Sequence, residues 1–359
     1  MFSAILVLLF ILGFAAQQYM KGGLVKAFIL FISSLVALAV ALGYYELLGG
    51  FAAGFLGEKA YVFTCALPFI FVMILIAELA KRILKESPDI EEMVDRAGGV
   101  VFGALTGLIC AGMAFIIIGL VPYGITKHVY APYKDTMNNP PQPAAALLKA
   151  DKVAAGIFSY MSKSGFAGST NFAVVNADFI DKLFLNHSFI ETEKATGLRA
   201  KEDVVSVEAG GMIRAPEKLK KLVGEKTELV DPVSGQTLYI VTANINSASL
   251  EISEEGGQDV GFGQIRLVAV PKGMEVDSPG IAGTTIYSVG FINDKGLLET
   301  VKLSDMVKFA ENSSEVKLAF YVPVDQEPAM IQVKLNGAAI VRAAPAKPAK
   351  PETPKTEDI

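Results

Sequence analysis

Four long apolar runs, separated by short polar segments, fill the first third of the chain. They lie at residues 2–17, 27–45, 60–80 and 98–121. An α-helix rises about 1.5 Å per residue, so about 20 apolar residues cross the ~30 Å hydrocarbon core of a bilayer. The first run lacks the basic start of a signal peptide. Tyr44 and Tyr45 close the second run and are expected to anchor it at the interface. The pattern predicts a four-span helical membrane domain at residues 1–122.

After this membrane domain, the spacing of apolar residues becomes that of short amphipathic helices. A proline-rich stretch at 138–143 comes first and is expected to be an extended spacer. Apolar residues then recur three or four positions apart at about 144–162, and a further helix is expected at 177–187. We therefore expect residues 123–190 to form a linker with amphipathic helices.

From about residue 204 onward, apolar and polar residues alternate, which is typical of half-buried strands. The alternating runs lie at 239–246, 264–270, 284–292, 300–309, 316–322 and 330–335. About six or seven such strands between Gly, Pro, Asn and Asp turns predict a mostly-β, immunoglobulin-like sandwich at 200–341. Asn336-Gly337 is expected to turn its last hairpin. The Ala-, Pro- and Lys-rich tail at 342–359 is expected to be disordered.

Basic residues are unevenly divided between the two sides of the predicted bundle. The second connection between spans holds only Lys59. The first and third connections hold Lys21, Lys26, Lys81, Arg82, Lys85 and Arg96. Connections rich in Lys and Arg stay in the cytoplasm. We therefore expect a multi-pass membrane protein whose N- and C-termini, with everything after residue 122, are extracytoplasmic.

Composition narrows the possible chemistry. The formal net charge is −5, and neither part of the chain has the basic excess of a nucleic-acid-binding protein. Cys65 and Cys110 are the only cysteines and lie in apolar runs, so no cysteine metal site is expected. No Gly-x-Ser-x-Gly nucleophile elbow occurs. His128 is expected at the headgroups and His187 as a carbonyl cap at a helix end. We predict no enzyme, no metal and no cofactor.

Three glycines recur every four residues in the fourth apolar run: Gly99, Gly103 and Gly107. On a helix they form one stripe, which lets the backbone of another helix approach closely. Asp95 and Arg96 stand just before this stripe. The carboxylate suits the positive end of the helix, and the guanidinium could reach lipid phosphates or Glu78. The five residues predict a helix-packing motif through which a homo-oligomer could form.

Two acidic features each allow two interpretations. Glu78, near the cytoplasmic end of the third run, could belong to an intramembrane proton or ion relay. It could equally be an interface residue paired with Lys81 and Arg82 three and four positions on, which we favour. A second acidic cluster comprises Glu251, Glu254, Glu255 and Asp259. Its spacing matches no known calcium loop, so we interpret it as a solvated turn.

The string from Asp95 to Gly107 resembles the signature of the colicin V production protein family. The order of other features fits as well: Gly13-Phe14 ends the first span, and the basic turn Lys21-Gly22-Gly23 follows. The amphipathic helix after the fourth span extends the resemblance over about residues 1–162. Two departures stand out. Ser3 occupies the region where the family usually has an aspartate, and residues 24–27 lack an acid that the family often has there.

The resemblance implies a bacterial inner-membrane protein involved in toxin production or export and in envelope homeostasis. Some relatives fuse the four helices to an extracytoplasmic serine protease, whose motifs this chain lacks. We therefore expect a non-enzymatic platform whose outer β domain binds an envelope or secreted protein partner. Membrane lipids and a second copy of the chain are the other expected partners. The alternative is a channel or transporter component with Glu78, Asp95 and Arg96 at its cytoplasmic mouth.

Overall fold

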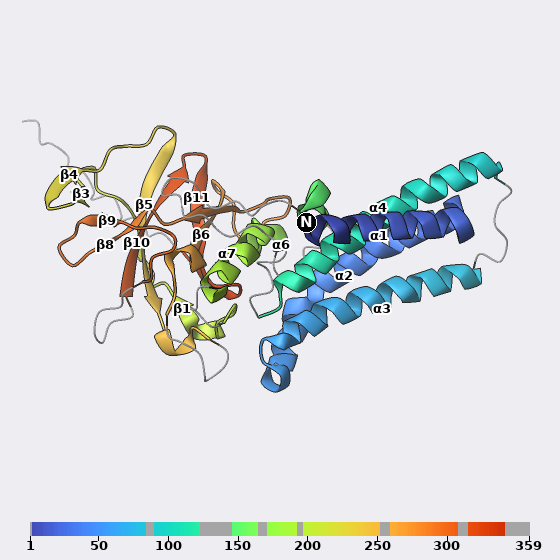
Figure 1. Ribbon diagram of the computed structural model, residues 1–359. Helices are drawn as coiled ribbons and strands as arrows, with labels where there is room; N and C mark the ends of the chain where they lie inside the picture. The colour runs from blue at the N-terminus through green and yellow to red at the C-terminus, as the bar shows by residue number, and fades with distance from the viewer. Residues whose placement is uncertain are drawn as a thin grey trace, which may run out of the picture.

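A bundle of four long helices and a domain of two β-sheets lie end to end in the computed structural model (Figure 1). The structure describes residues 2–83, 90–122, 146–163, 171–191, 197–251, 259–307 and 315–341. The predicted spacer at 138–143 and the predicted tail at 342–359 lie outside these ranges, as does His128. The two-part architecture expected from the sequence, four apolar helices followed by a mostly-β region, is confirmed.

The four apolar helices have the length and composition to cross a membrane, so the chain is a multi-pass membrane protein. They are α1 (Phe2–Lys21), α2 (Leu24–Leu56), α3 (Lys59–Ile83) and α4 (Glu92–Gly119). In space the packing order is α1, α4, α2, α3. Pro68 lies inside α3. Tyr45 was expected at the interface, but α2 continues past it and packing leaves its side chain only 1% exposed. Only Tyr44 is exposed there.

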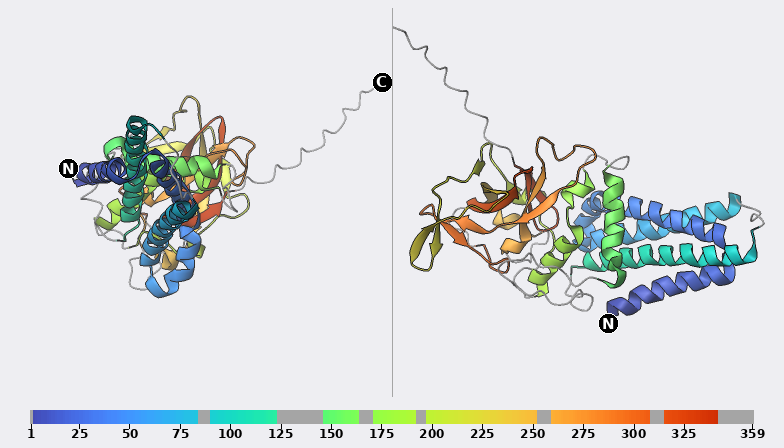
Figure 2. Two further views of the ribbon diagram at one scale, coloured as in Figure 1. Left: turned by 90° about the vertical axis from the view of Figure 1, so that its right-hand side faces the viewer. Right: turned by 90° about the horizontal axis from the view of Figure 1, so that it is seen from above.

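Three shorter helices lie between the bundle and the sheets: α5 (Ala150–Ser162), α6 (Phe172–Val175) and α7 (Phe179–Glu191). Seen from above, α5 runs across the bundle at the end that faces the β domain (Figure 2). A 3₁₀ turn (Leu147–Lys149) precedes α5. The predicted helix therefore starts later than expected, because Leu148 and Lys149 have positive φ angles of 56° and 50°.

The β domain is built from a large sheet and a small one. The strands of the large sheet are β1 (Val205–Ser206), β2 (Met212–Arg214), β3 (Lys220–Val223), β4 (Lys226–Leu229), β5 (Gln236–Ile245), β8 (Gly290–Ile292), β9 (Leu298–Thr300) and β10 (Glu315–Pro323). Those of the small sheet are β6 (Ile265–Pro271), β7 (Thr284–Tyr287), β11 (Gln326–Val333) and β12 (Gly337–Ile340). The strand order of the large sheet is β1-β5-β10-β8-β9-β3-β4, and β2 also pairs with β5. The strand order of the small sheet is β12-β11-β6-β7.

Alternate residues of both sheets share one core, which explains the period-two pattern of the sequence. Val241 of β5 and Phe320 of β10 meet Leu267 of β6 and Ile331 of β11, and all four are fully buried. The predicted hairpin at Asn336-Gly337 is present, since Val333 pairs with Gly337. The parallel pairing of β3 with β9 and the number of strands differ from the antiparallel seven-strand immunoglobulin arrangement.

The predicted strand at 300–309 is wrong in extent. Strand β9 ends at Thr300, and Lys302 donates its N–H to Asp305 Oδ2 at 2.8 Å, which closes a turn. Residues 308–309 lie outside the described part of the chain. Beyond this turn the segment forms only an isolated β-bridge, between Met306 and Gly261, so the apolar Val301 and Val307 pack on the core from a loop.

Candidate functional site

The glycine stripe of α4 packs against the backbone of α1. A Cβ added at Gly103 would lie 2.8 Å from the carbonyl oxygen of Phe14, and one added at Gly107 would lie 2.6 Å from that of Phe10. Any side chain at these positions would therefore collide with main-chain atoms. The stripe thus serves an intramolecular contact. An oligomer through this same face would have to displace α1, so a homo-oligomer stays a proposal that needs another face.

Asp95 joins the start of α4 to the start of α2. Its Oδ1 accepts the backbone N–H of Leu24 at 2.7 Å, which satisfies one of the unpaired donors at the beginning of α2. Gly23 has a φ of 81°, and a Cβ there would collide with the Asp95 carboxylate. The N–H groups of Gly22 and Gly23 both donate to the carbonyl of Gln18 at 3.0 Å. The turn at Lys21-Gly22-Gly23 and the start of α4 therefore form one hydrogen-bonded junction.

Arg96 lies beside this hydrogen-bonded junction, but its side chain extends along the surface. It forms an ion pair with Glu92 of the same helix, and its guanidinium carbon lies 5.5 Å from the ring centre of Tyr19 on α1. The sequence pointed instead to lipid phosphates or Glu78 as its partner. Glu78 itself is exposed near the end of α3. Both interpretations of Glu78 stay open.

Replacing Asp95 by alanine should lower the free energy of unfolding by about 1 kcal/mol, the usual cost of losing a helix cap. Asp95→Asn should cost less, because the amide oxygen can still accept the Leu24 N–H. Thermal unfolding can be followed with a thiol-reactive dye, since the two cysteines, Cys65 and Cys110, are both buried in the bundle. Equal unfolding temperatures for Asp95→Ala and the unmodified protein would contradict the capping role.

A second polar site lies at the other end of the bundle, where the β domain contacts it. Glu58, in the turn between α2 and α3, accepts the backbone N–H of Arg199 at 2.8 Å and that of Leu198 at 3.3 Å. The guanidinium of Arg199 lies 3.6 Å from the ring centre of Tyr61 and 5.6 Å from that of Tyr45, and Arg199 is only 3% exposed. Burial raises the pKa of Glu58, whereas the two backbone hydrogen bonds and Arg199 oppose that shift.

Further contacts extend this junction. His187 of α7 donates from Nε2 to the carbonyl oxygen of Gly119 at 2.6 Å, so it caps a helix end as expected, although the helix is α4. The N–H of Leu335 donates to the carbonyl of Leu198 at 3.1 Å. Leu198 and Leu335 also belong to the same apolar core as α2, α4, α5 and α7. The bundle and the β domain are therefore joined by continuous packing.

Glu251 was interpreted as part of a solvated turn, and the structure corrects this. Its side chain is 5% exposed, and Oε1 lies 3.8 Å from Nζ of the fully buried Lys334. Burial lowers the pKa of Lys334, and the charges of Glu251 and Glu58 oppose that shift. Glu254 and Glu255 lie outside the described residues, and Asp259 is exposed. Within the described ranges no group of three His, Cys, Asp or Glu could hold a metal ion.

A buried lysine should make stability depend on pH. Lys182 of α7 is 1% exposed and donates to Asn176 Oδ1 at 3.0 Å. Burial is the main cause that lowers its pKa well below the ordinary value. The unfolded chain then binds the proton more tightly, so the free energy of unfolding rises with pH between the lowered pKa and about 10.4, by at most about 1.4 kcal/mol per pH unit.

Lys182→Met should flatten this rise, while the exposed control Lys317→Met should leave it unchanged. The measurement is the unfolding temperature in detergent from about pH 7 to about pH 10. The upper limit stays below the pKa of a lysine in the unfolded chain, about 10.4. Parallel curves for Lys182→Met and the unmodified protein would show that Lys182 does not titrate with folding.

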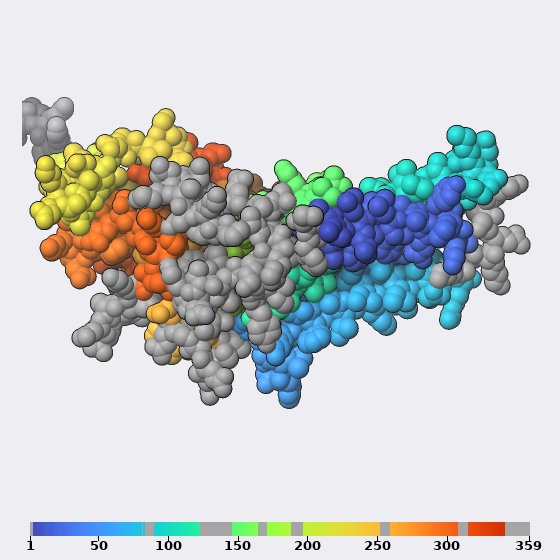
Figure 3. Space-filling model, in the orientation of Figure 1, coloured from blue at the N-terminus to red at the C-terminus, as the bar shows by residue number. Residues whose placement is uncertain are grey.

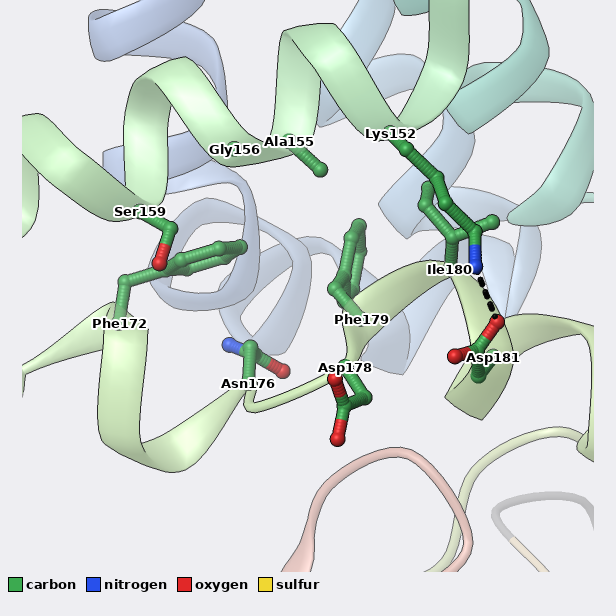
Figure 4. Close-up of a pocket in the computed structure, with 10 residues that line it drawn as sticks. All are labelled: Lys152, Ala155, Gly156, Ser159, Phe172, Asn176, Asp178, Phe179, Ile180 and Asp181. Carbon is green, nitrogen blue, oxygen red and sulfur yellow. Dashed lines mark hydrogen bonds and ion pairs between the residues drawn. The ribbon is translucent and has the colours of Figure 1, made fainter. Parts of the chain in front are cut away.

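A pocket of about 210 Å³ lies between α5 and the α6–α7 pair (Figure 4). Lys152 of α5 and Asp181 of α7 form an ion pair of 3.0 Å at one side of it, and burial raises the pKa of Asp181. Phe172 and Phe179 supply apolar walls, and Ser159 of α5 lies at the opposite side. The residues that line the pocket include no His or Cys, so Ser159 has no imidazole base there.

The sequence singled out Asp95, Arg96 and the glycines but missed Glu58 and Arg199. These two belong to no recognisable motif and are 141 residues apart. The one available signal was that an arginine and a glutamate flank predicted apolar elements without a local partner. Such a signal does not identify which residues meet, because the contact depends on how the two domains dock.

Comparison with known proteins supports the assignment of the helical part. Searches of curated proteins and of solved structures found no significant match to the chain. The model of the family described as colicin V production protein matches residues 4–134, which covers α1 to α4 and stops before α5. That family is not a known enzyme family. The four-helix membrane region of this chain is thus similar to the colicin V production protein family, and an additional C-terminal β domain follows it.

Proposed function

We propose that this protein is a non-enzymatic platform of the bacterial inner membrane that acts in toxin production or export and in envelope homeostasis. In this role the four helices hold the β domain at the extracytoplasmic surface, where it binds an envelope or secreted protein. The observation that carries the proposal is the junction. A β domain fixed through Glu58, Arg199 and a shared apolar core has a set orientation on its membrane base.

The orientation rests on charge. The β domain lies at the end of the bundle opposite the facing ends of α3 and α4 (Figure 1). Among the connections between spans, the basic Lys21, Lys26 and Arg96 lie at that opposite end, whereas the connection between α2 and α3 at the β-domain end holds only Lys59. The positive-inside rule then supports a cytoplasmic α3–α4 end and an extracytoplasmic β domain. The toxin role rests on the family, whose description is production of colicin V.

Two fusions test the orientation. Alkaline phosphatase, active only outside the cytoplasm, and green fluorescent protein, fluorescent only inside it, are each attached after Ile359. Phosphatase activity without fluorescence supports the proposal, and fluorescence overturns it. For the toxin role, deleting the gene in a toxin-secreting host should lower secreted toxin activity while leaving the intracellular toxin in place. Unchanged secretion would overturn that part.

Liposome assays separate the platform from a channel. The purified chain should not raise proton or potassium flux above that of protein-free vesicles. Two buried hydroxyls of the bundle donate within their own helices, Ser33 to the carbonyl of Ile29 and Thr106 to that of Phe102, which favours packing over ion coordination. If the unmodified chain carries an ion flux that disappears in Glu78→Gln or Arg96→Ala, the protein is a channel and the platform proposal is wrong.

A further inference from the structure

Helix α2 is longer than a bilayer requires. Its 33 residues span about 50 Å, whereas the hydrocarbon core is ~30 Å thick. Since Asp95 fixes the start of α2 at the basic end of the bundle, about 20 residues bring the helix to the region of Tyr45. The remaining segment, residues 46–56, therefore extends beyond the span on the side of the β domain. We call it the α2 extension.

The α2 extension presents an apolar stripe that none of the described residues covers. Leu47, Phe51 and Phe55 recur every four residues and are 58%, 76% and 93% exposed. No charged residue occurs between Glu46 and Glu58. Both acids that bracket the extension are engaged inside the protein, since Glu46 accepts the hydroxyl of Tyr45 at 2.8 Å and Glu58 binds the β domain. The exposed face is thus apolar along its whole length.

The position of the extension points to its partner. It forms the corner with α3 at the β-domain end of the bundle, and in the space-filling view this corner projects from the lower edge of the molecule (Figure 3). Its stripe continues onto the exposed face of α3, where Phe63, Leu67 and Phe71 are 49%, 61% and 65% exposed. Helix α3 is long and apolar enough to cross a membrane, and we infer that this exposed face meets lipid. Exposed apolar side chains therefore occur on both α3 and the α2 extension, with the exposed Lys59 between Phe55 and Phe63.

We propose that the α2 extension is an interfacial anchor, with Leu47, Phe51 and Phe55 inserted among the acyl chains of the leaflet nearest the β domain. Helices with one aromatic and aliphatic face sit about 5–10 Å into the boundary between headgroups and acyl chains. The occupant is the phospholipid bilayer itself. The proposal rests on the four spans and is independent of the platform role.

The sequence permits a direct test, because the chain contains no tryptophan. The full chain with Phe51→Trp is reconstituted into phosphatidylcholine vesicles whose acyl chains carry bromine at shallow or deep carbons. Bromine quenches tryptophan only on contact, so shallow bromines should lower the emission of Trp at this position by about twofold, and deep bromines less. Phe71→Trp in mid-span should show the reverse order. Val324→Trp, in the exposed turn between β10 and β11, should be unaffected.

Absence of quenching in both Phe51→Trp and Phe55→Trp, with Phe71→Trp quenched, would overturn the anchor. Two causes of that result can be told apart. Emission that shifts to the blue as the protein-to-lipid ratio rises would mean that a second copy covers the stripe. Emission at the wavelength of exposed tryptophan at every ratio would mean that the stripe faces water. Because Phe71→Trp reports a correctly inserted span, a misfolded variant is recognised by loss of its quenching in a Phe51→Trp/Phe71→Trp double variant.

Discussion

Gly107→Leu should lower the free energy of unfolding of the helical bundle by about 3 kcal/mol, the upper end of the usual cost of overpacking. A Cβ there would lie 2.6 Å from the carbonyl oxygen of Phe10 and 2.7 Å from Cα of Ile11. Main-chain atoms cannot rotate aside as a side chain can, so α1 would have to move as a body. The measurement is the temperature at which buried Cys110 of α4 becomes reactive toward a thiol-specific dye.

The matched control is Gly13→Leu on α1, where an added Cβ meets nothing within 4 Å. This variant should stay within about 0.5 kcal/mol of the unmodified protein. The same reasoning ranks Gly103→Leu as more damaging than Arg96→Lys, whose side chain is half exposed. If Gly107→Leu and Gly13→Leu unfold at the same temperature, α1 and α4 do not pack through the stripe.

Glu58→Ala should loosen the β domain from the bundle, because two backbone N–H groups lose their acceptor at a cost of about 1–3 kcal/mol each. The variant loses the acceptor of two backbone N–H groups and leaves the buried guanidinium of Arg199 without its nearby carboxylate. Hydrogen exchange at the amides of Leu198 and Arg199 reports the loss directly. Both amides should exchange much faster while the amides inside β5 and β10 remain protected.

A second substitution separates charge from packing. Arg199→Met in the Glu58→Ala background should recover part of the lost stability, because it removes the uncompensated charge while keeping an apolar side chain against Tyr61. Glu92→Ala serves as the control, since that glutamate lies on the surface in an ion pair and should contribute at most about 0.5 kcal/mol. No recovery in the double variant would mean that the hydrogen bonds, and not the charge, hold the junction.

Much of the fold could be predicted because its signals are local. Long apolar runs define the spans, and inward-facing residues such as Val241 and Phe320 produce the alternation of β5 and β10. The strands missed by the sequence lack that signal. All four residues of β4 are exposed, and β3 buries none of its residues. Neither strand therefore has a buried apolar face that would produce an alternating pattern in the sequence.

The site residues divide in the same way. The glycine spacing and Asp95 were visible in the sequence, but the partner of Asp95 is the N–H of Leu24, 71 residues earlier. A backbone donor has no residue type, so no pattern identifies it. Tyr45 was misplaced for a related reason. The side chain is apolar enough for a span and polar enough for an interface, and its burial depends on distant residues that pack on it, such as Phe179 and Arg199.

The packing order of the helices bears on how the protein is assembled during synthesis. Helices α1 and α2 leave the ribosome first, yet α1 packs mainly on α4, and the N–H of Leu24 finds Asp95 only when α4 arrives. A helix satisfies its own backbone bonds, so α1 can wait in the lipid as a solitary segment. Insertion into the membrane and association of the helices are then separate stages. A chain whose synthesis stops before Glu92 would leave α1 in the membrane without its main packing partner, α4.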